Sequence, residues 1–523
     1  MKYLVVQVFW YFDQVTGEFN YRIRKPGEIL AQHPDFLVCN IHLFHPLFSQ
    51  LALAADLLIL HLLADEEVGH IIALRKKLGK PTIYEIPDNF LSLGPWVGTD
   101  DALRNPQIRQ NFLFNASQCD ALQLSSPELQ KTFGYLNPRT QVFENQTDQF
   151  SAPSPGDTFV FGWGGSKGHE ADLAEVAPAI ERFCRDHPDA VFSYMGYEPI
   201  FQRYFAQIPN AQCRPGGPIE DYYAFLEHLE VGMAPLRDTE FNRCRSDVKF
   251  LEYAAHGVVP VLSDAACYRV HGEDGQNCFF FKDPDQLYAR LAFLYRNAEE
   301  RRAAAQRAYD YASVKRSLSN HLDRRASFYK TLLFFDPNVD ELPLLPDCEG
   351  LIGYIRKVTY LFEACRLVEA MELLAKVLEM HPTFPQAHMW RLRTMVKGGH
   401  LEEALATYRD YEVSPIYWDI LHEQLAIASF ALGDPNWREH HRRILSPVTR
   451  LRLEPTNRLD REMIFRQILD FNPYHYDSLV SLSILLSRGG KPQEALGFLR
   501  RAERINPEEI DVDGALAKLL NPS

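Results

Sequence analysis

The chain has 523 residues, 46% of them hydrophobic, and carries a formal net charge of −14 at pH 7. Its length is enough for three domains of ordinary size or for two large ones. The acidic balance argues against an extended nucleic-acid-binding surface, although a local basic pocket can still hold a diphosphate group. We therefore expect no nucleic-acid partner.

Nine cysteines are scattered from Cys39 to Cys365 without a C-x-x-C pair or a metal-ligand spacing. This distribution is typical of reduced thiols and predicts no metal site. The most apolar segment, residues 51–64, is interrupted by Asp56 and His61 and is well short of a bilayer span. We expect a cytoplasmic protein without a transmembrane segment.

Residues 1–150 alternate short apolar runs with helical patterns, which predicts a parallel α/β organisation and one Rossmann-like domain. The linker SAPSPGD, which begins at Ser151, marks the end of this domain. The expected strands are residues 3–9, 36–41, 57–60, 82–86, 121–124 and 141–143.

Two places in this domain carry candidate functional residues. Arg22 and Arg24 lie between the first strand and a helix, where a basic loop can meet a phosphate group or an acceptor. A solvated helix start explains them equally well. Asp88 follows the strand that ends at Ile86, and its carboxylate is a candidate to orient an acceptor hydroxyl or to act as a base. The simpler explanation for Asp88 is an Asx turn.

Residues 151–335 are expected to form a second Rossmann-like domain. Its first strand, TFVFGWG, runs into the glycine-rich loop GGSKG, in which Gly164 and Gly165 allow the backbone to approach a ligand closely. The spacing fits neither the G-x-G-x-x-G pattern nor the P-loop pattern, so it indicates neither a dinucleotide nor a P-loop nucleotide site.

The stretch from Phe241 to Asp264 combines an irregular turn at residues 241–245, a helix over residues 247–256 capped by Ser246, and a short buried strand. Lys249, Glu252 and Tyr253 share one helical face. Free amides at a helix start favour an anion, but a carboxylate in the first turn, Asp247, opposes one unless its side chain turns away. Helix capping and a solvated Lys–Glu pair are the structural alternative.

This stretch resembles the donor-site helix of family 4 glycosyltransferases. The matching residues are Asn242, Ser246, Lys249, Glu252, Tyr253, Gly257, Pro260 and Val261. The loop GWGGSKGHEADL is also similar to loops of these enzymes, and the resemblance as a whole covers residues 1 to about 334. It places Ser166 and Lys167, together with His169, near a donor diphosphate. Capping of the following helix is the alternative role of His169 and Asp172.

The resemblance implies a GT-B fold and transfer of a sugar from a UDP- or GDP-linked donor to an acceptor hydroxyl, with retention and without a cofactor or metal. It gives Lys249 a catalytic role and gives Glu252 the ribose hydroxyls. This chain departs from the pattern twice. Cys244 stands where the first glutamate of the commoner form belongs, and Asn89 replaces one of two paired aspartates.

Residues 336–523 have helical patterns without strands. Ala370 and Ala404 are 34 residues apart, as are Pro473 and Pro507, which is typical of tetratricopeptide repeats. We expect four to five helix pairs that bind a protein or glycan acceptor or another protein partner.

Two other functions remain open at the level of sequence. A decayed transferase core that only displays the repeats is favoured by Cys244 and Asn89. A nucleotide-sugar epimerase on the same fold would form product from the donor alone.

Overall fold

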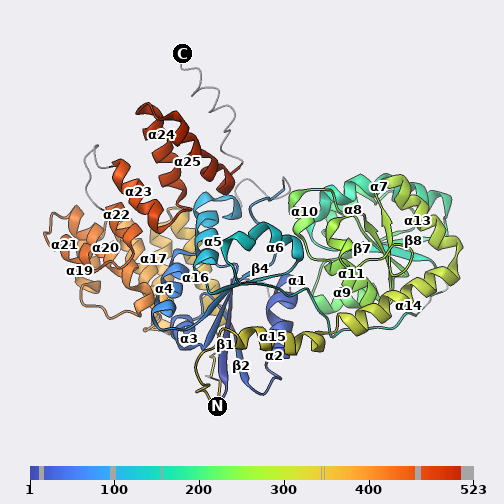
Figure 1. The fold of residues 1–523 in the computed structure, drawn as a ribbon, viewed down its shortest axis with the longest axis horizontal. Coiled ribbons are helices and arrows are strands. Elements are labelled where there is room, and N and C mark those ends of the chain that lie inside the picture. The colour runs from blue at the N-terminus through green and yellow to red at the C-terminus, as the bar shows by residue number, and fades with distance from the viewer. Residues whose placement is uncertain are drawn as a thin grey trace.

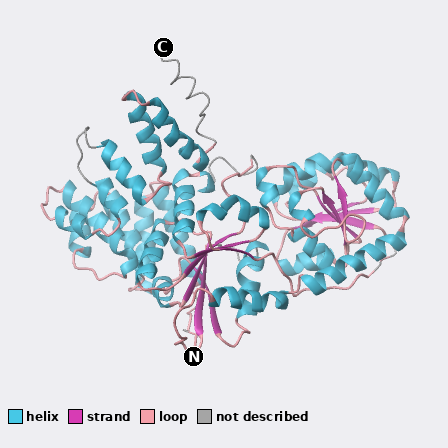
Figure 2. Cartoon of the chain, viewed as in Figure 1, coloured by secondary structure: helices cyan, strands magenta, loops and turns pink. Residues whose placement is uncertain are grey.

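A computed structural model describes residues 1–10, 17–94, 102–154, 156, 158–342, 344–346, 348–453 and 461–507. The chain forms two α/β domains and a helical arm, with the first α/β domain between the other two parts (Figure 1). Figure 2 shows two separate sheets with helices on their faces. The described residues of the arm are helical or loop.

The first sheet has six parallel strands in the order β2-β1-β3-β4-β5-β6. Each strand lies within one residue of its expected bounds, because buried parallel strands are continuous apolar runs that the sequence displays directly. The bounds are β1 Tyr3–Phe9, β2 Phe36–His42, β3 Leu57–His61, β4 Thr82–Ile86, β5 Ala121–Leu124 and β6 Thr140–Val142.

The helices of this domain cover both faces of its sheet. They are α1 Gly17–Phe19, the π-helix η1 Asn20–Arg24, α2 Lys25–Leu30, α3 Phe48–Ala54, α4 Glu66–Lys77, η2 Ala102–Arg104, α5 Pro106–Gln118, α6 Pro127–Phe133 and η3 Gly134–Leu136. The expected basic loop is therefore helical: Arg22 and Arg24 lie within η1.

The second sheet is also parallel, in the order β12-β11-β10-β7-β8-β9. The edge strand β9 was not expected, because its AQCRP sequence has no apolar run and its residues are only partly buried. The bounds are β7 Val160–Gly164, β8 Val191–Gly196, β9 Ala211–Pro215, β10 Val231–Ala234, β11 Val259–Ser263 and β12 Phe279–Phe281.

The stretch singled out in the sequence folds differently from expectation at its start. Residues 241–245 are not irregular, because α10 spans Glu240–Cys244 and the Thr239 hydroxyl caps it by accepting a hydrogen bond from the Asn242 amide. Asp247, not Ser246, is the N-cap of α11, which spans Val248–Ala255. Gly257 ends this helix with a φ of 65°, a backbone conformation that favours glycine.

The remaining helices of the second domain surround its sheet. They are η4 Lys167–His169, α7 Glu170–Asp186, α8 Glu198–Tyr204, α9 Ile219–Leu226, α12 Ala266–Arg269, α13 Pro284–Arg296 and α14 Ala298–Lys315.

After α14 the chain crosses back to the first domain through η5 (Leu318–His321) and α15 (Leu322–Lys330). Ala326 and Tyr329 pack against the first sheet in one hydrophobic cluster with Val5 and Ile83. The Tyr329 hydroxyl also donates a hydrogen bond to Gln123 Oε1 at 2.7 Å. Residues 322–330 thus complete the core of the first domain although they follow the second one in the sequence.

The helical arm packs on the first domain, with which it shares one hydrophobic cluster. Its helical character confirms that part of the sequence interpretation, whereas the tetratricopeptide assignment stays a prediction. The helices are α16 Glu349–Glu363, α17 Leu367–Met380, α18 Pro385–Lys397, α19 Leu401–Tyr408, η6 Pro415–Tyr417, α20 Trp418–Ala431, α21 Trp437–Arg443, α22 Pro447–Leu453, α23 Arg461–Phe471, α24 Tyr476–Arg488 and α25 Pro492–Ile505.

None of the helices in the described ranges has both the length and the apolar character needed to cross a bilayer.

Arg316, between α14 and η5, is buried and forms hydrogen bonds to two other segments of the chain. Its guanidinium donates to both carboxylate oxygens of Asp247, at 2.5 and 2.8 Å, and to the Asn145 carbonyl at 2.8 Å. Burial alone would raise the pKa of Asp247, but the charge of Arg316 outweighs it and holds that pKa below its ordinary value. The end of the first domain, the start of α11 and the crossover are therefore fastened together.

We expect Arg316→Met to lower the free energy of unfolding by about 3–5 kcal/mol, because it leaves the buried Asp247 carboxylate unpaired. Urea denaturation followed by circular dichroism measures this loss. Arg324→Met is the matched control, since Arg324 is 45% exposed, pairs with Glu144 at 3.4 Å and donates to the Val142 carbonyl without joining the two domains. Equal losses in the two variants would contradict a special role for Arg316.

Candidate active site

A cavity of 920 Å³ lies between the two α/β domains, where the strands of both sheets end. Ligands of open parallel sheets bind outside the carboxyl ends of the strands, so this is the expected position of a site. Asp88 follows β4, Ser125 follows β5 and Gly165 follows β7. Predicted site residues that line the cavity are Arg22, Asp88, Gly165, Ser166, Ser246, Lys249 and Glu252.

Glycines at the carboxyl ends of β7 and β8 allow the two chain segments to approach closely. A Cβ atom on Gly196 would come within 2.6 Å of the Gly165 carbonyl, and one on Gly165 would meet the Trp163 ring at 2.8 Å. Gly164 lies below the cavity, against Tyr222 and Phe225. Lys167 is exposed and does not line the cavity. The loop therefore presents backbone and the small Ser166 side chain to a ligand.

Lys249 and Glu252 form a buried cluster with a residue that the sequence did not single out, Tyr222 of α9. Lys249 Nζ donates to the Tyr222 hydroxyl at 2.6 Å and to Glu252 Oε2 at 3.0 Å, and the Tyr222 hydroxyl donates to the same carboxylate oxygen at 3.0 Å. Only 4% of the Glu252 side chain and 15% of that of Lys249 are exposed, so the pair is not a solvated surface pair. An ammonium group has three N–H donors, which leaves Lys249 one for a ligand.

Arg245 is a second cation at the cavity, and a hydrogen-bonded chain holds it there. The Asp172 carboxylate accepts from His169 Nδ1 at 2.9 Å, so Nε2 is free to accept from Arg245 Nη1, also at 2.9 Å. Burial and the adjacent Arg245 charge lower the pKa of His169 to about 4. His169 and Asp172 thus position Arg245 instead of capping α7, where no side-chain cap is found.

The amino-terminal end of α11 faces the cavity without an opposing charge from Asp247. That carboxylate points to Arg316, and Asp247 is not among the residues that line the cavity. Ser246 lines it instead, and its hydroxyl accepts a hydrogen bond from Asn145 Nδ2 at 3.0 Å. The helix start therefore keeps its preference for an anion.

On the first-domain side of the cavity, Asp88 is the candidate general base. Burial raises the pKa of its carboxyl, while the Arg245 and Arg22 charges act in the opposite direction. Arg22 is buried and paired with Glu85, and it also donates to Asn145 Oδ1 at 3.0 Å. Arg24 does not line the cavity: it donates to Asn20 and lies 3.7 Å from Glu220.

Two other predicted donor residues lie away from this cavity. Tyr253 is fully buried, and its hydroxyl donates to the Met233 carbonyl at 2.7 Å. Asn242 donates to the Arg237 carbonyl at 3.0 Å and lines a neighbouring cavity of 510 Å³ instead. Their spacing on the sequence matched the family pattern, but neither side chain reaches the space between the domains.

The two departures from the family pattern, Cys244 and Asn89, are in contact with each other. Asn89 Nδ2 lies 3.7 Å from Cys244 Sγ, and the Ser126 hydroxyl donates to the Cys244 carbonyl at 2.7 Å. Cys244 is buried against the first domain and does not line the cavity. A carboxylate at each position would place two like charges together, so the neutral pair is consistent as a unit.

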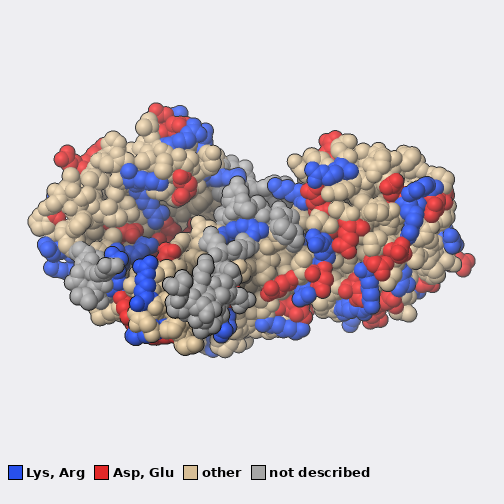
Figure 3. Space-filling model, turned by 90° about the horizontal axis from the view of Figure 1, so that it is seen from above, with Lys and Arg blue, Asp and Glu red and all other residues tan. Residues whose placement is uncertain are grey.

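Charged side chains of both signs are interspersed over the second domain on the face seen in Figure 3. Within the described ranges, no group of three or more His, Cys, Asp or Glu side chains is arranged to hold a metal ion.

Comparison with known proteins connects the second domain to sugar transfer. Residues 177–329 match the family model described as "Glycosyl transferase-like". The matched segment contains α11 with Lys249 and Glu252. No curated protein sequence matches the chain.

Several solved structures are similar to this chain. HepE from Anabaena, in complex with UDP-glucose, is 13% identical with a TM-score of 0.48, over 63% of this chain and 100% of HepE. Sucrose-phosphate synthase from Thermosynechococcus elongatus is 12% identical with a TM-score of 0.48, over 63% and 99%. The pneumococcal O-GlcNAc transferase GtfA is 16% identical with a TM-score of 0.40, over 53% and 57%. The evidence for two α/β domains is the presence of two six-stranded parallel sheets, because TM-scores below 0.5 do not establish a shared fold.

We expect His169→Gln to flatten the dependence of stability on pH. The pKa of His169 is about 4 in the folded protein and 6.5 ordinarily. The unfolded chain therefore binds the proton more readily, and the free energy of unfolding falls as pH drops from 6.5 towards 4. Urea denaturation across this range measures the slope. The exposed His228→Gln is the control, and an unchanged slope in His169→Gln would refute the buried neutral imidazole.

We expect Cys244→Glu to destabilise the protein on the order of 3 kcal/mol, because it buries a carboxylate against Asn89 without a cationic partner. Thermal and urea unfolding measure the loss. Cys213→Glu, on the partly exposed edge strand β9, is the matched control. A stable Cys244→Glu variant would show instead that position 244 can face the cavity as an acid.

Proposed function

We propose that the protein is a glycosyltransferase that moves a sugar from a nucleotide-sugar to an acceptor hydroxyl, with retention of configuration. One observation carries the proposal: Arg245, Lys249 and the free start of α11 converge on an interdomain cavity opposite Asp88. The match of residues 177–329 to the glycosyl transferase-like family supports it.

The chemistry of the cavity suits a departing diphosphate. Negative charge grows on the leaving diphosphate in the transition state, and fixed cations and backbone amides stabilise it without reorganisation. Arg245 is fixed by His169, and Lys249 by Tyr222 and Glu252.

The donor's other parts have candidate partners in the same cavity. The Glu252 carboxylate can accept hydrogen bonds from two adjacent ribose hydroxyls. The end of β8 contributes Gly196 to the lining, and the segment after β9 contributes residues 216–219. There we place the base of a UDP- or GDP-linked donor.

The acceptor belongs on the first-domain side. Asp88, whose pKa burial raises, would orient the attacking hydroxyl or accept its proton. We further propose that the helical arm recruits a protein or glycan acceptor, or a partner in glycan assembly.

Turnover of a panel of UDP- and GDP-sugars tests the assignment. We expect Lys249→Ala to lower kcat on the order of 10²-fold, because it removes one transition-state cation. Glu252→Gln should mainly raise the donor KM, because the neutral amide accepts ribose hydrogen bonds less strongly. Arg243→Ala is the matched control, since Arg243 is exposed and paired with Asp238 outside the cavity.

Calorimetry with UDP and GDP separates the other candidate functions. Unchanged turnover in both Lys249→Ala and Glu252→Gln would remove the site assignment. Absence of binding to either nucleotide would favour a non-catalytic scaffold. Conversion of the donor into an isomer without an acceptor would favour an epimerase.

A further inference from the structure

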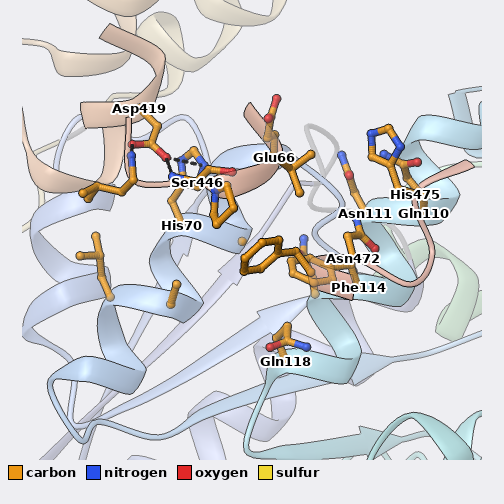
Figure 4. A pocket seen from close by; sticks show the side chains of 18 of the residues that line it. Glu66, His70, Gln110, Asn111, Phe114, Gln118, Asp419, Ser446, Asn472 and His475 are labelled. Carbon is orange, nitrogen blue, oxygen red and sulfur yellow. Dashed lines mark hydrogen bonds and ion pairs between the residues drawn. The ribbon is translucent and has the colours of Figure 1, made fainter. Parts of the chain in front are cut away.

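A second cavity, of 320 Å³, lies between the first α/β domain and the helical arm (Figure 4). One wall is formed by α4 and α5, and the other by arm segments that include residues 445–448 and 471–475. This cavity and the candidate active site have no lining residue in common. In Figure 1, α4 and α5 face the arm, on the side of the first domain away from the second domain.

The acidic groups in this cavity already have partners within its walls. Asp419 accepts hydrogen bonds from the Leu445 and Ser446 amides, both at 2.6 Å, and lies 3.6 Å from His70 Nε2. Glu66 is paired with Arg452 at 3.3 Å. Among the described lining residues, no carboxylate is left unpaired for a cationic ligand.

The described lining also has no cluster of basic side chains that would select an anionic ligand. Arg452 is shared between Glu66 and Glu423. Lys77 lies at the exposed rim of the cavity. One rim lysine does not select a phosphorylated ligand, because exposed charges contribute little to binding free energy.

The other polar side chains of the lining are mainly neutral hydrogen-bonding groups. The Asn111 side chain forms no hydrogen bond with another described residue, so its amide is available to a ligand. Asn472 uses its oxygen to accept from the Tyr474 amide, which leaves its NH₂ group. The Gln118 side chain makes one long hydrogen bond to a described residue, 3.4 Å from its Nε2 to the Ser117 hydroxyl. Each group can donate to or accept from a hydroxyl.

An aromatic surface stands among these amides. Figure 4 shows the Phe114 ring in the middle of the cavity, with Gln118 on one side and Asn111 and Asn472 on the other. Amides around an aromatic ring match a ligand that has many hydroxyl groups and an apolar C–H face. A pyranose ring has both.

We propose that this cavity binds a neutral saccharide of one or two sugar units. The size lies at the lower end of the roughly 300–1,000 Å³ typical of small-molecule sites, which fits one or two sugars and not an extended polypeptide. Since α5 supplies Asn111 and the arm supplies Asn472, the bound sugar would bridge the first domain and the arm. The site is independent of the proposed transfer reaction.

Saturation-transfer NMR on the full-length protein tests the proposal, with glucose, galactose, N-acetylglucosamine, maltose and lactose as probes. We expect at least one probe to bind. Asn111→Ala should weaken it about tenfold, the loss expected for one neutral hydrogen-bonding group. Ala73→Trp should abolish binding, because exposed Ala73 lines the cavity and a tryptophan would fill it.

The controls separate this site from the interdomain cavity. Ala224→Trp, at an exposed position on α9 outside both cavities, should bind the probe normally, as should Lys249→Ala. Urea denaturation confirms that each variant is folded. Absence of binding by all five probes would overturn the proposal, and so would binding that survives Ala73→Trp or is lost in Lys249→Ala. Binding of peptides without any saccharide would also overturn it.

Discussion

The buried ion pair between Arg316 and Asp247 is the interaction on which the rest of the site depends. It holds a carboxylate away from the start of α11, where that charge would oppose an anion. The same guanidinium binds the Asn145 carbonyl, at the point where the first domain ends. One side chain therefore couples the anion preference of a helix to the relative position of the two domains.

The cationic groups at the cavity are held in place before any ligand arrives. Arg245 is oriented by a neutral His169, which in turn is fixed by Asp172, and Lys249 lies between Tyr222 and Glu252. Such preorganised charges stabilise a developing diphosphate without reorienting. Because Lys249 is paired with Glu252, the carboxylate offsets part of the ammonium charge.

Sequence patterns predicted the features that depend on neighbouring residues in the chain, such as buried strands and helix faces. Apolar runs located all six strands of the first sheet, and helical spacing placed Lys249 and Glu252 on one face. Tyr222, Arg245 and the role of His169 were missed because they depend on contacts between residues 27 to 76 positions apart. No local periodicity records such contacts. For the same reason, Asn242 and Tyr253 matched a spacing although their side chains lie outside the cavity.

Cys244 and Asn89, the two departures from the family pattern, are in contact and therefore belong to one structural feature. Taken separately, each looks like the loss of an acid and suggests decay of a catalytic site. In the structure the two side chains meet at a buried interface between α10 and the first domain, outside the cavity. A carboxylate at either position would be buried there without a cationic partner, which costs several kcal/mol. The neutral side chains of Cys244 and Asn89 avoid that cost and still form the interdomain contact. Arg245 and Lys249 line the cavity independently of this contact.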